Sequence, residues 1–155
     1  MAGVQGPDEA GEVASAVYAA SSRLFLRCTA GSIFQSQPAP TALADAAATL
    51  TSAQVLTGIL TITPSVARVL TLPTATLLVR NIPGCEAGDC IDFHIINAAT
   101  TEDFIATIAV GTGGTLVGIG IVEGPVATYE KSGSSTFRIR VTSTSTPAYK
   151  CYRLV

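Results

Sequence analysis

Tryptophan is absent from this 155-residue chain, and charged side chains are scarce. They make up 13% of the residues, against about 25% in an ordinary soluble domain. From residue 46 to residue 84 the only charged residues are Arg68 and Arg80. Because interface cores are poor in charge, we expect the chain to bury part of its surface in an oligomer or a lattice. The alternative is a monomer whose surface is wetted by threonine, serine and asparagine.

Lysine is also rare, since only Lys131 and Lys150 occur, and the net charge is −2. No run of basic residues could neutralise the phosphates of a nucleic acid, so we expect no nucleic-acid partner. Arg138 and Arg140 alternate in "FRIRV" and would lie on one face of a strand. We interpret that face as solvated.

Long apolar runs are missing as well, and a membrane-spanning helix needs about 18 or more consecutive apolar residues. The first residues carry Asp8, Glu9 and Glu12, where a secretory signal would be basic. We therefore expect neither a membrane partner nor export by a signal peptide.

Metal-binding patterns are absent. The four cysteines, at positions 28, 85, 90 and 151, do not have the usual spacing of a structural zinc site, and His94, the only histidine, lies outside any ligand motif. We expect no metal and no cofactor. In "GCEAGDC", Cys85 and Cys90 would form a disulfide across a loop or, in a reducing compartment, remain thiols.

Catalytic patterns are equally sparse. Asp92 and His94 lie two residues apart and would share a strand face, where an acid can orient a histidine base. However, the chain has no nucleophile elbow of the Gly-x-Ser-x-Gly kind. We therefore predict a protein that is not an enzyme, with His94 in a structural role.

Glycine is abundant between Val110 and Gly120, in "VGTGGTLVGIG". Counted from Gly111, the sixth position of a dinucleotide-binding loop is Leu116, and no lysine stands where a P-loop requires one. We predict instead that Gly113 and Gly114 turn a hairpin between the strands at 104–110 and 115–122. Gly118 and Gly120 would share a strand face and leave room for another backbone or for a bulge.

Two parts of different texture make up the chain. Residues 1–49 read as an extended N-terminal arm and linker with one strand at Arg23–Cys28, because Pro38 and Pro40 interrupt regular structure. Residues 50–155 read as one β-domain with short helices. Thr51 or Ser52 would cap the first helix and Gly58 end it, and a second would follow Thr74 and stop at Pro83 and Gly84.

Alternation dominates the rest of the β-domain. We expect six residues to point inward from two strands: Ile91, Phe93, Ile95, Phe137, Ile139 and Val141. Many short strands with few helices are typical of an antiparallel β-sandwich or jelly-roll-like domain, and this is the predicted fold class.

Four stretches carry a family resemblance: "RVLTLPTA", "GDCIDFHIIN", "GTGGTLVG" and the terminal "YRLV". From Leu50 to Val155 the chain resembles a β-rich domain of virion structural proteins in tailed phages and large algal DNA viruses. The resemblance implies a capsid decoration, cement or head-fibre protein, located in the virion and often trimeric. Its partners would be other copies of itself and the major capsid protein or other virion proteins.

Candidate interface residues lie at both ends of the chain. Leu24, Phe25 and Leu26 in "RLFLRC" would dock on a capsid shell, either by adding a strand to it or as part of an extended arm over neighbouring subunits. The apolar C-terminal stretch would be hidden between subunits, and there we expect Tyr149, Tyr152 and Leu154 in the interface. The alternative function is a carbohydrate-binding head for host attachment, with Tyr129, Tyr149 and Tyr152 as platforms for sugar rings.

Overall fold

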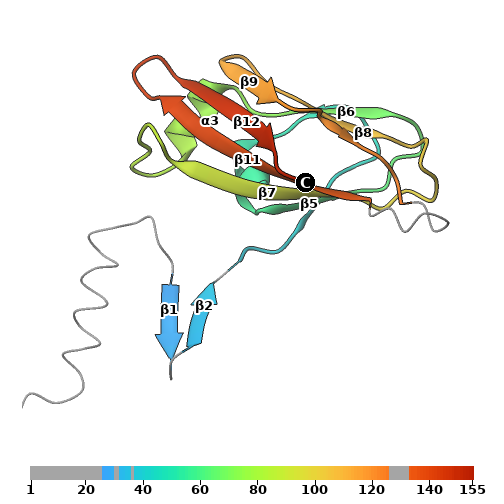
Figure 1. Cartoon of the computed structure of the whole chain (residues 1–155), viewed down its shortest axis with the longest axis horizontal. Helices are drawn as coiled ribbons and strands as arrows, with labels where there is room; N and C mark the ends of the chain where they lie inside the picture. The colour runs from blue at the N-terminus through green and yellow to red at the C-terminus, as the bar shows by residue number, and fades with distance from the viewer. Residues whose placement is uncertain (1–25, 30–31, 36, 126–132) are drawn as a thin grey trace, which may run out of the picture. The chain divides into compact units, whose positions relative to one another are not determined.

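Two compact units make up the chain in the computed structural model, Met1–Ser36 and Gln37–Val155, and the residues described are 26–29, 32–35, 37–125 and 133–155 (Figure 1). In the first unit, β1 (Leu26–Thr29) and β2 (Ser32–Gln35) pair antiparallel. The strand predicted at Arg23–Cys28 overlaps β1, whereas β2 was not predicted. The second unit begins at Gln37, upstream of the boundary expected at residue 50.

Residues 37–155 form two β-sheets. The strands of the six-stranded sheet are, in spatial order, β3 (Thr41–Ala42), β5 (Ile59–Ile62), β7 (Cys90–Asn97), β11 (Ser134–Ser143), β12 (Ala148–Arg153) and β9 (Gly114–Val117). Those of the four-stranded sheet are β10 (Ile121–Val122), β8 (Ala106–Ala109), β6 (Arg68–Thr71) and β4 (Ala48–Thr49).

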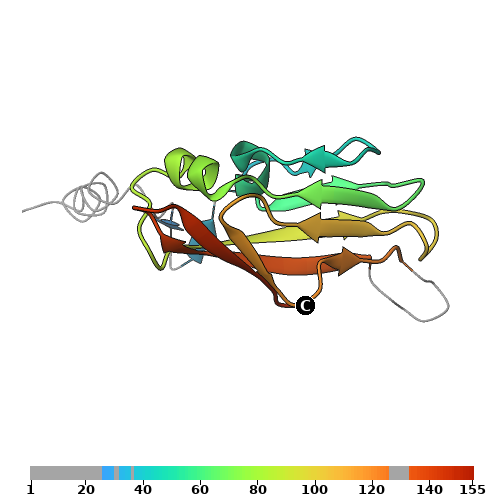
Figure 2. The ribbon, with the colours of Figure 1, turned by 90° about the horizontal axis from the view of Figure 1, so that it is seen from above.

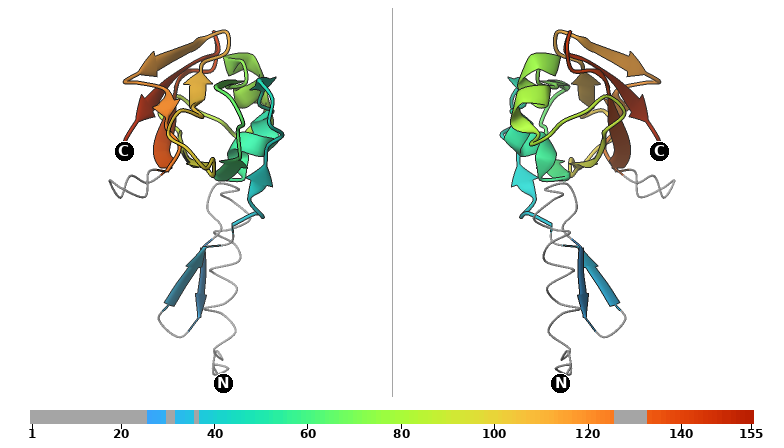
Figure 3. Two further views of the ribbon diagram at one scale, coloured as in Figure 1. Left: turned by 90° about the vertical axis from the view of Figure 1, so that its right-hand side faces the viewer. Right: turned by 90° about the vertical axis from the view of Figure 1, so that its left-hand side faces the viewer.

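The chain winds between the sheets, because the strands from β3 to β10 belong alternately to the larger and the smaller sheet. Neighbours in one sheet therefore come from successive turns of the winding and run parallel, as β3, β5 and β7 do in one sheet and β4, β6 and β8 in the other. Figure 3 shows these strands nearly end-on around a common interior.

The prediction of a mainly β fold with short helices is confirmed, but its antiparallel character is not. Only β10 with β8 and β11 with both β7 and β12 pair antiparallel in residues 37–125 and 133–155. Parallel strands need a crossover connection, usually a long helix. Here a strand in the opposite sheet makes the crossover. The sequence therefore shows short strands separated by turns, as it would in an antiparallel fold.

Both predicted helices are present, as Figure 2 shows. Each begins at an expected cap residue. α2 (Ser52–Leu56) starts at Thr51, whose Oγ1 accepts a hydrogen bond from the Gln54 N–H while the Gln54 side chain accepts one from the Thr51 N–H. α3 (Ala75–Asn81) starts at Thr74, whose Oγ1 accepts from the Leu77 N–H. Each helix is two turns or fewer, so packing on the sheets holds it.

The core lies between the two sheets and the helices. Five of the six residues predicted to point inward are buried, and Ile91, near the start of β7, is partly exposed. The rings of Phe93 and Phe137 stack with centroids 5.5 Å apart. Leu70, Ile108 and Val122 face them from the four-stranded sheet. One polar side chain crosses this interior: Asn97 Nδ2 donates to the carbonyls of Phe104, at 2.7 Å, and Val122, at 3.0 Å.

The glycine run does not form the predicted hairpin. β8 and β9 belong to different sheets, so residues 110–113 carry the chain from one sheet to the other. Gly113 turns there with φ of +82°, a conformation that favours glycine. Gly118 and Gly120 lie in the return link between β9 and β10 and not on a strand. The expected close backbone approach does occur at Gly120, against Ile108.

Candidate functional site

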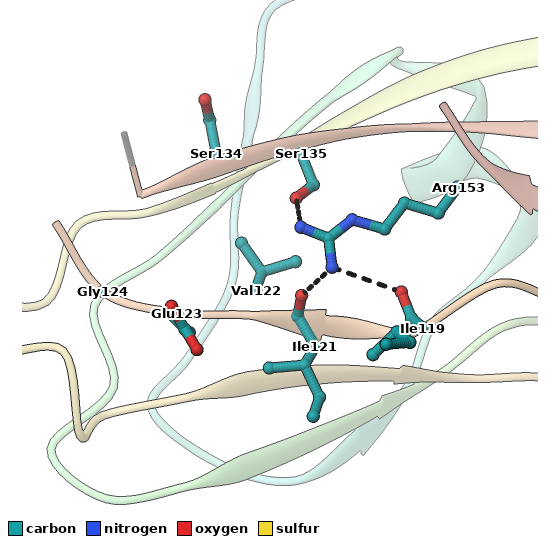
Figure 4. Close-up of a pocket in the computed structure, with 8 residues that line it drawn as sticks. All are labelled: Ile119, Ile121, Val122, Glu123, Gly124, Ser134, Ser135 and Arg153. Atoms are coloured by element: carbon teal, nitrogen blue, oxygen red, sulfur yellow. Dashed lines mark hydrogen bonds between the residues drawn. The ribbon is translucent and has the colours of Figure 1, made fainter. Parts of the chain in front are cut away.

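A pocket of about 380 Å³ opens between the two sheets, near Arg153 at the end of β12 (Figure 4). One wall is the chain from Ile119 to Gly124, which contains β10, and the opposite wall is the start of β11, at Ser134 and Ser135. The side chain of Arg153 extends between these walls. The sequence patterns did not point to this pocket.

Arg153 links the two sheets. In β12 it follows buried Tyr149 and Cys151 at intervals of two residues, so its side chain lies on the same, inner face of the strand. Nη1 donates to the Ile121 carbonyl at 2.7 Å and more weakly to that of Ile119, at 3.4 Å, while Nη2 donates to Ser135 Oγ at 2.9 Å. The guanidinium thereby fixes the β9–β10 link against the larger sheet.

Arg153→Met should lower the free energy of unfolding by about 1 kcal/mol, because it keeps the apolar stem and removes hydrogen bonds from a solvent-exposed cation. Arg153→Lys should recover only part of this loss, since one ammonium cannot reproduce the guanidinium fork. Urea unfolding monitored by circular dichroism measures both. Equal stability of Arg153→Met and the wild type would contradict the linking role.

Exposed apolar side chains surround this end of the fold. Five of them come from β9, the link after it, β10 and the residues after β12, and we call them the edge strip: Val117, Ile119, Ile121, Leu154 and Val155. The largest exposed fractions are 62% for Ile119 and 78% for Val155. Val117 is paired with Tyr152 of β12, and Leu154 continues along β11 through a hydrogen bond from its N–H to the Thr136 carbonyl.

The strand at this edge lacks the usual protection against pairing. β9 is the last strand of the six-stranded sheet, and among the described strands none pairs with its outer edge. Monomeric proteins normally protect such an edge with lysine, another charge or proline. Here no charged residue and no proline occurs from Phe104 to Val122. An uncharged edge strand beside exposed apolar side chains is suited to contact another protein surface.

The predicted interface residues have different environments. Leu24 and Phe25 lie outside the described residues, and Leu26 begins β1. Leu154 is 47% exposed and belongs to the edge strip, and Tyr152 is partly exposed on the outer face of the larger sheet. These placements leave both available for a subunit contact.

Tyr149 was placed wrongly in the interface and among the sugar platforms, because its side chain is only 2% exposed. Its hydroxyl donates to the Pro73 carbonyl at 3.0 Å and accepts from the Gly111 N–H at 3.2 Å. Alternation in "AYKCYR" contains the signal for this burial, since it places Tyr149 on the same face as Cys151. Tyr129 lies outside the described residues, so Tyr152 is the one tyrosine of the sugar hypothesis with a described exposed surface.

Asp92 and His94 do not act on each other through a hydrogen bond. Both oxygens of Asp92 accept from Arg138, at 2.6 Å from Nε and 2.7 Å from Nη2, and Arg138 thereby lowers the pKa of the Asp92 carboxyl. His94 Nδ1 instead lies 3.0 Å from Thr136 Oγ1. The carboxylate is engaged by Arg138 and does not orient the imidazole.

Cys85, Cys90 and Cys151 are thiols, so the disulfide considered for Cys85 and Cys90 is not formed. Cys151 is fully buried, and this burial raises the pKa of its thiol to about 12. Within the described residues, no three His, Cys, Asp or Glu side chains gather as metal ligands would, and no helix is long and apolar enough to cross a membrane.

In comparisons with known proteins, no family model, curated protein or solved structure matches the chain.

Proposed function

We propose that this chain is a non-enzymatic structural protein of a virion, a capsid decoration, cement or fibre component that assembles as a homotrimer on the capsid surface. Two things support the proposal. One is the sequence resemblance of residues 50–155 to virion proteins. The other is a surface built for contact with other subunits, and that surface carries most of the weight.

The decisive observation is the edge strip together with the open edge of β9. Isolated apolar residues are common on protein surfaces, but here three come from the unpaired edge strand β9 and the segment that follows it. Two more, Leu154 and Val155, follow β12, the strand that pairs with β9. Residues 104–122 contain no charged side chain that would discourage this edge from pairing with another chain. Burial of the strip between subunits removes the apolar side chains from water and covers the edge of β9.

In a homotrimer with a threefold axis, each copy would present the edge strip to the next copy, and the contact would close into a ring. A sandwich-like arrangement of two sheets gives that ring a rigid wall, because the strands are fixed by one shared core. Such a ring provides shape and binding surface without a reactive centre, as a decoration or fibre protein requires.

Ile119→Asp is expected to convert the trimer to a monomer. A carboxylate at the most exposed position of the link after β9 would be buried without a partner in the assembled state. We expect the association to weaken about 30-fold or more, in the range found for central interface residues. Light scattering on a sizing column gives the native mass, about 47 kDa for three chains of 15.8 kDa.

Val66→Asp is the matched control. Val66 is 50% exposed, similar to the strip residues, but it lies between β5 and β6, away from the β9 edge. We expect it to remain trimeric. Dissociation by both substitutions, or by neither, would contradict an interface at the edge strip.

Location in a virion needs a separate test. Co-expression of the chain with the major capsid protein of the virus that carries its gene should give shells that retain it during sedimentation. Shells that sediment without it would contradict a decoration or cement role, even if the homotrimer forms.

A further inference from the structure

Two neighbouring rows of side chains cross the outer face of the six-stranded sheet. The strand register of β7, β11, β12 and β9 aligns four residues in each row. From β7 across to β9, the residues of the Asp92 row are Asp92, Arg138, Tyr152 and Val117. Those of the Cys90 row are Cys90, Arg140, Lys150 and Thr115.

The Asp92 row neutralises its own cation. Asp92 lies opposite Arg138 in the register of β7 and β11, and both guanidinium bonds to its carboxylate are short. This is the two-pronged arrangement that gives the strongest arginine–carboxylate pairs. The positive charge of Arg138 is therefore matched within the sheet.

The Cys90 row has two cations and no acid. Cys90 is opposite Arg140 in the position that Asp92 has opposite Arg138, and Lys150 faces Arg140 from the other side. Both cations are exposed, and neither has a hydrogen bond or ion pair through its side chain within the described residues. Like charges that face each other across two strands destabilise a sheet. The repulsion between Arg140 and Lys150 is therefore unfavourable in the fold, and a carboxylate from another molecule would reduce it.

We propose that Arg140 and Lys150 form a docking point for an acidic segment of a separate protein, whose carboxylate occupies the place that Asp92 has in the neighbouring row. The inference goes beyond self-assembly, because the partner must carry the opposite charge.

Charge complementarity favours a protein carboxylate over a nucleic acid. Only two unmatched cations lie in the row, whereas nucleic-acid surfaces combine many basic residues, and the chain as a whole has a net charge of −2. A local acidic group can approach two cations on a rigid sheet, while a long polyanion would meet repulsion over the rest of the protein.

The test uses the full chain and a fluorescent peptide of alternating glutamate and serine, with binding measured by anisotropy at low salt, where surface attraction is strongest. We expect the wild type to bind, and the double substitution Arg140→Gln with Lys150→Gln to reduce affinity about tenfold or more. Arg80→Gln is the control, because Arg80 is an exposed cation on α3 outside both rows. No binding by the wild type, or equal loss with Arg80→Gln, overturns the proposal.

Cys90→Asp gives an independent readout that keeps both cations. The new carboxylate would lie opposite Arg140 as Asp92 lies opposite Arg138, so it would occupy the docking point from within the chain. We expect it to weaken peptide binding about tenfold and to raise the thermal midpoint by about 2 °C, which also shows that the variant folds. Wild-type affinity in Cys90→Asp overturns the proposal.

Two other probes separate the partner classes. A single-stranded oligonucleotide that binds at Arg140 and Lys150 when the acidic peptide does not would assign the site to a phosphate polymer and overturn the proposal. A change of native mass in the double variant would assign the cations to contacts between copies and would also overturn it. The edge-strip variants do not remove these cations, so failure of the trimer leaves this test intact.

Discussion

Replacement of Gly120 by alanine is expected to lower the free energy of unfolding by about 3 kcal/mol. Gly120 lies in the link between β9 and β10 and is buried against the backbone of Ile108. A Cβ at Gly120 would collide with the Ile108 carbonyl oxygen and come within 3.1 Å of its carbonyl carbon. These are backbone atoms, and they cannot move aside as the end of a side chain can.

A hydrogen bond makes this contact difficult to relax. The Ile108 N–H donates to the Gly120 carbonyl at 2.7 Å, so any shift that relieves the collision also lengthens this bond. The alanine would restrict the unfolded chain and gain a few tenths of a kcal/mol, but that gain is much smaller than the overpacking cost. Ile119 and Ile121 flank the glycine, so we expect weaker assembly as well as lower stability.

Thermal or urea unfolding measures the loss at Gly120, and native mass measures assembly. Thr115→Ala is the control for a small substitution in the same region, because Thr115 is exposed on β9. A Gly120→Ala protein as stable as the Thr115→Ala protein would contradict the close packing of this link on β8.

Alkaline pH should destabilise the protein by about 3 kcal/mol between pH 9 and pH 11. Burial raises the pKa of the Cys151 thiol from 9.0 to about 12. Burial likewise raises the pKa of Tyr149 from 10.0 to about 12, although the Gly111 N–H opposes part of the change. Both groups therefore stay neutral in the folded protein at a pH where they ionise in the unfolded chain.

The direction follows from proton binding. Above pH 9 the unfolded chain loses the thiol proton while the folded chain keeps it, so the unfolded state binds fewer protons and stability falls as pH rises. The contribution is complete below the unfolded pKa values and disappears as pH approaches about 12.

Cys151→Val isolates the thiol, since it replaces a buried small side chain with an apolar one of similar size. We expect the free energy of unfolding of this variant to fall about half as steeply with pH. Urea titrations in the presence of a reductant, from neutral pH to pH 11, measure both slopes. A wild-type slope of zero above pH 9 would show that neither group is held neutral.

Local signals allowed much of the fold to be predicted. Thr51 and Thr74 satisfy unpaired N–H groups at the helix starts, a contact between near neighbours in the chain, so both helices could be predicted. Alternation gave the correct faces for Phe93 and Phe137 because one side of each strand is buried.

Pairing between strands was less predictable, because it depends on residues far apart in the chain. β3 and β4 are only two residues long and exist through parallel pairing with β5 and β6, so a proline-containing stretch concealed them. Gly113 has the positive φ that a hairpin would also require, and its sequence does not distinguish a turn within a sheet from a crossing between sheets.

The candidate site was only partly predictable for the same reason. Leu154 was expected at an interface from its apolar surroundings, and it is 47% exposed in the residues that follow β12. Arg153 was not singled out, because its acceptors, the carbonyls of Ile119 and Ile121, are brought near it only by the link between the two sheets. The unmatched pair of Arg140 and Lys150 likewise became visible only once the strand register was known.

In the proposed assembly, the uncharged edge of β9 and the apolar side chains of the edge strip hold copies of this chain together. Sedimentation equilibrium of the wild-type protein over a dilution series tests it most directly. We expect the mass of three chains of 15.8 kDa, with dissociation only on strong dilution. A single-chain mass at every concentration would contradict it.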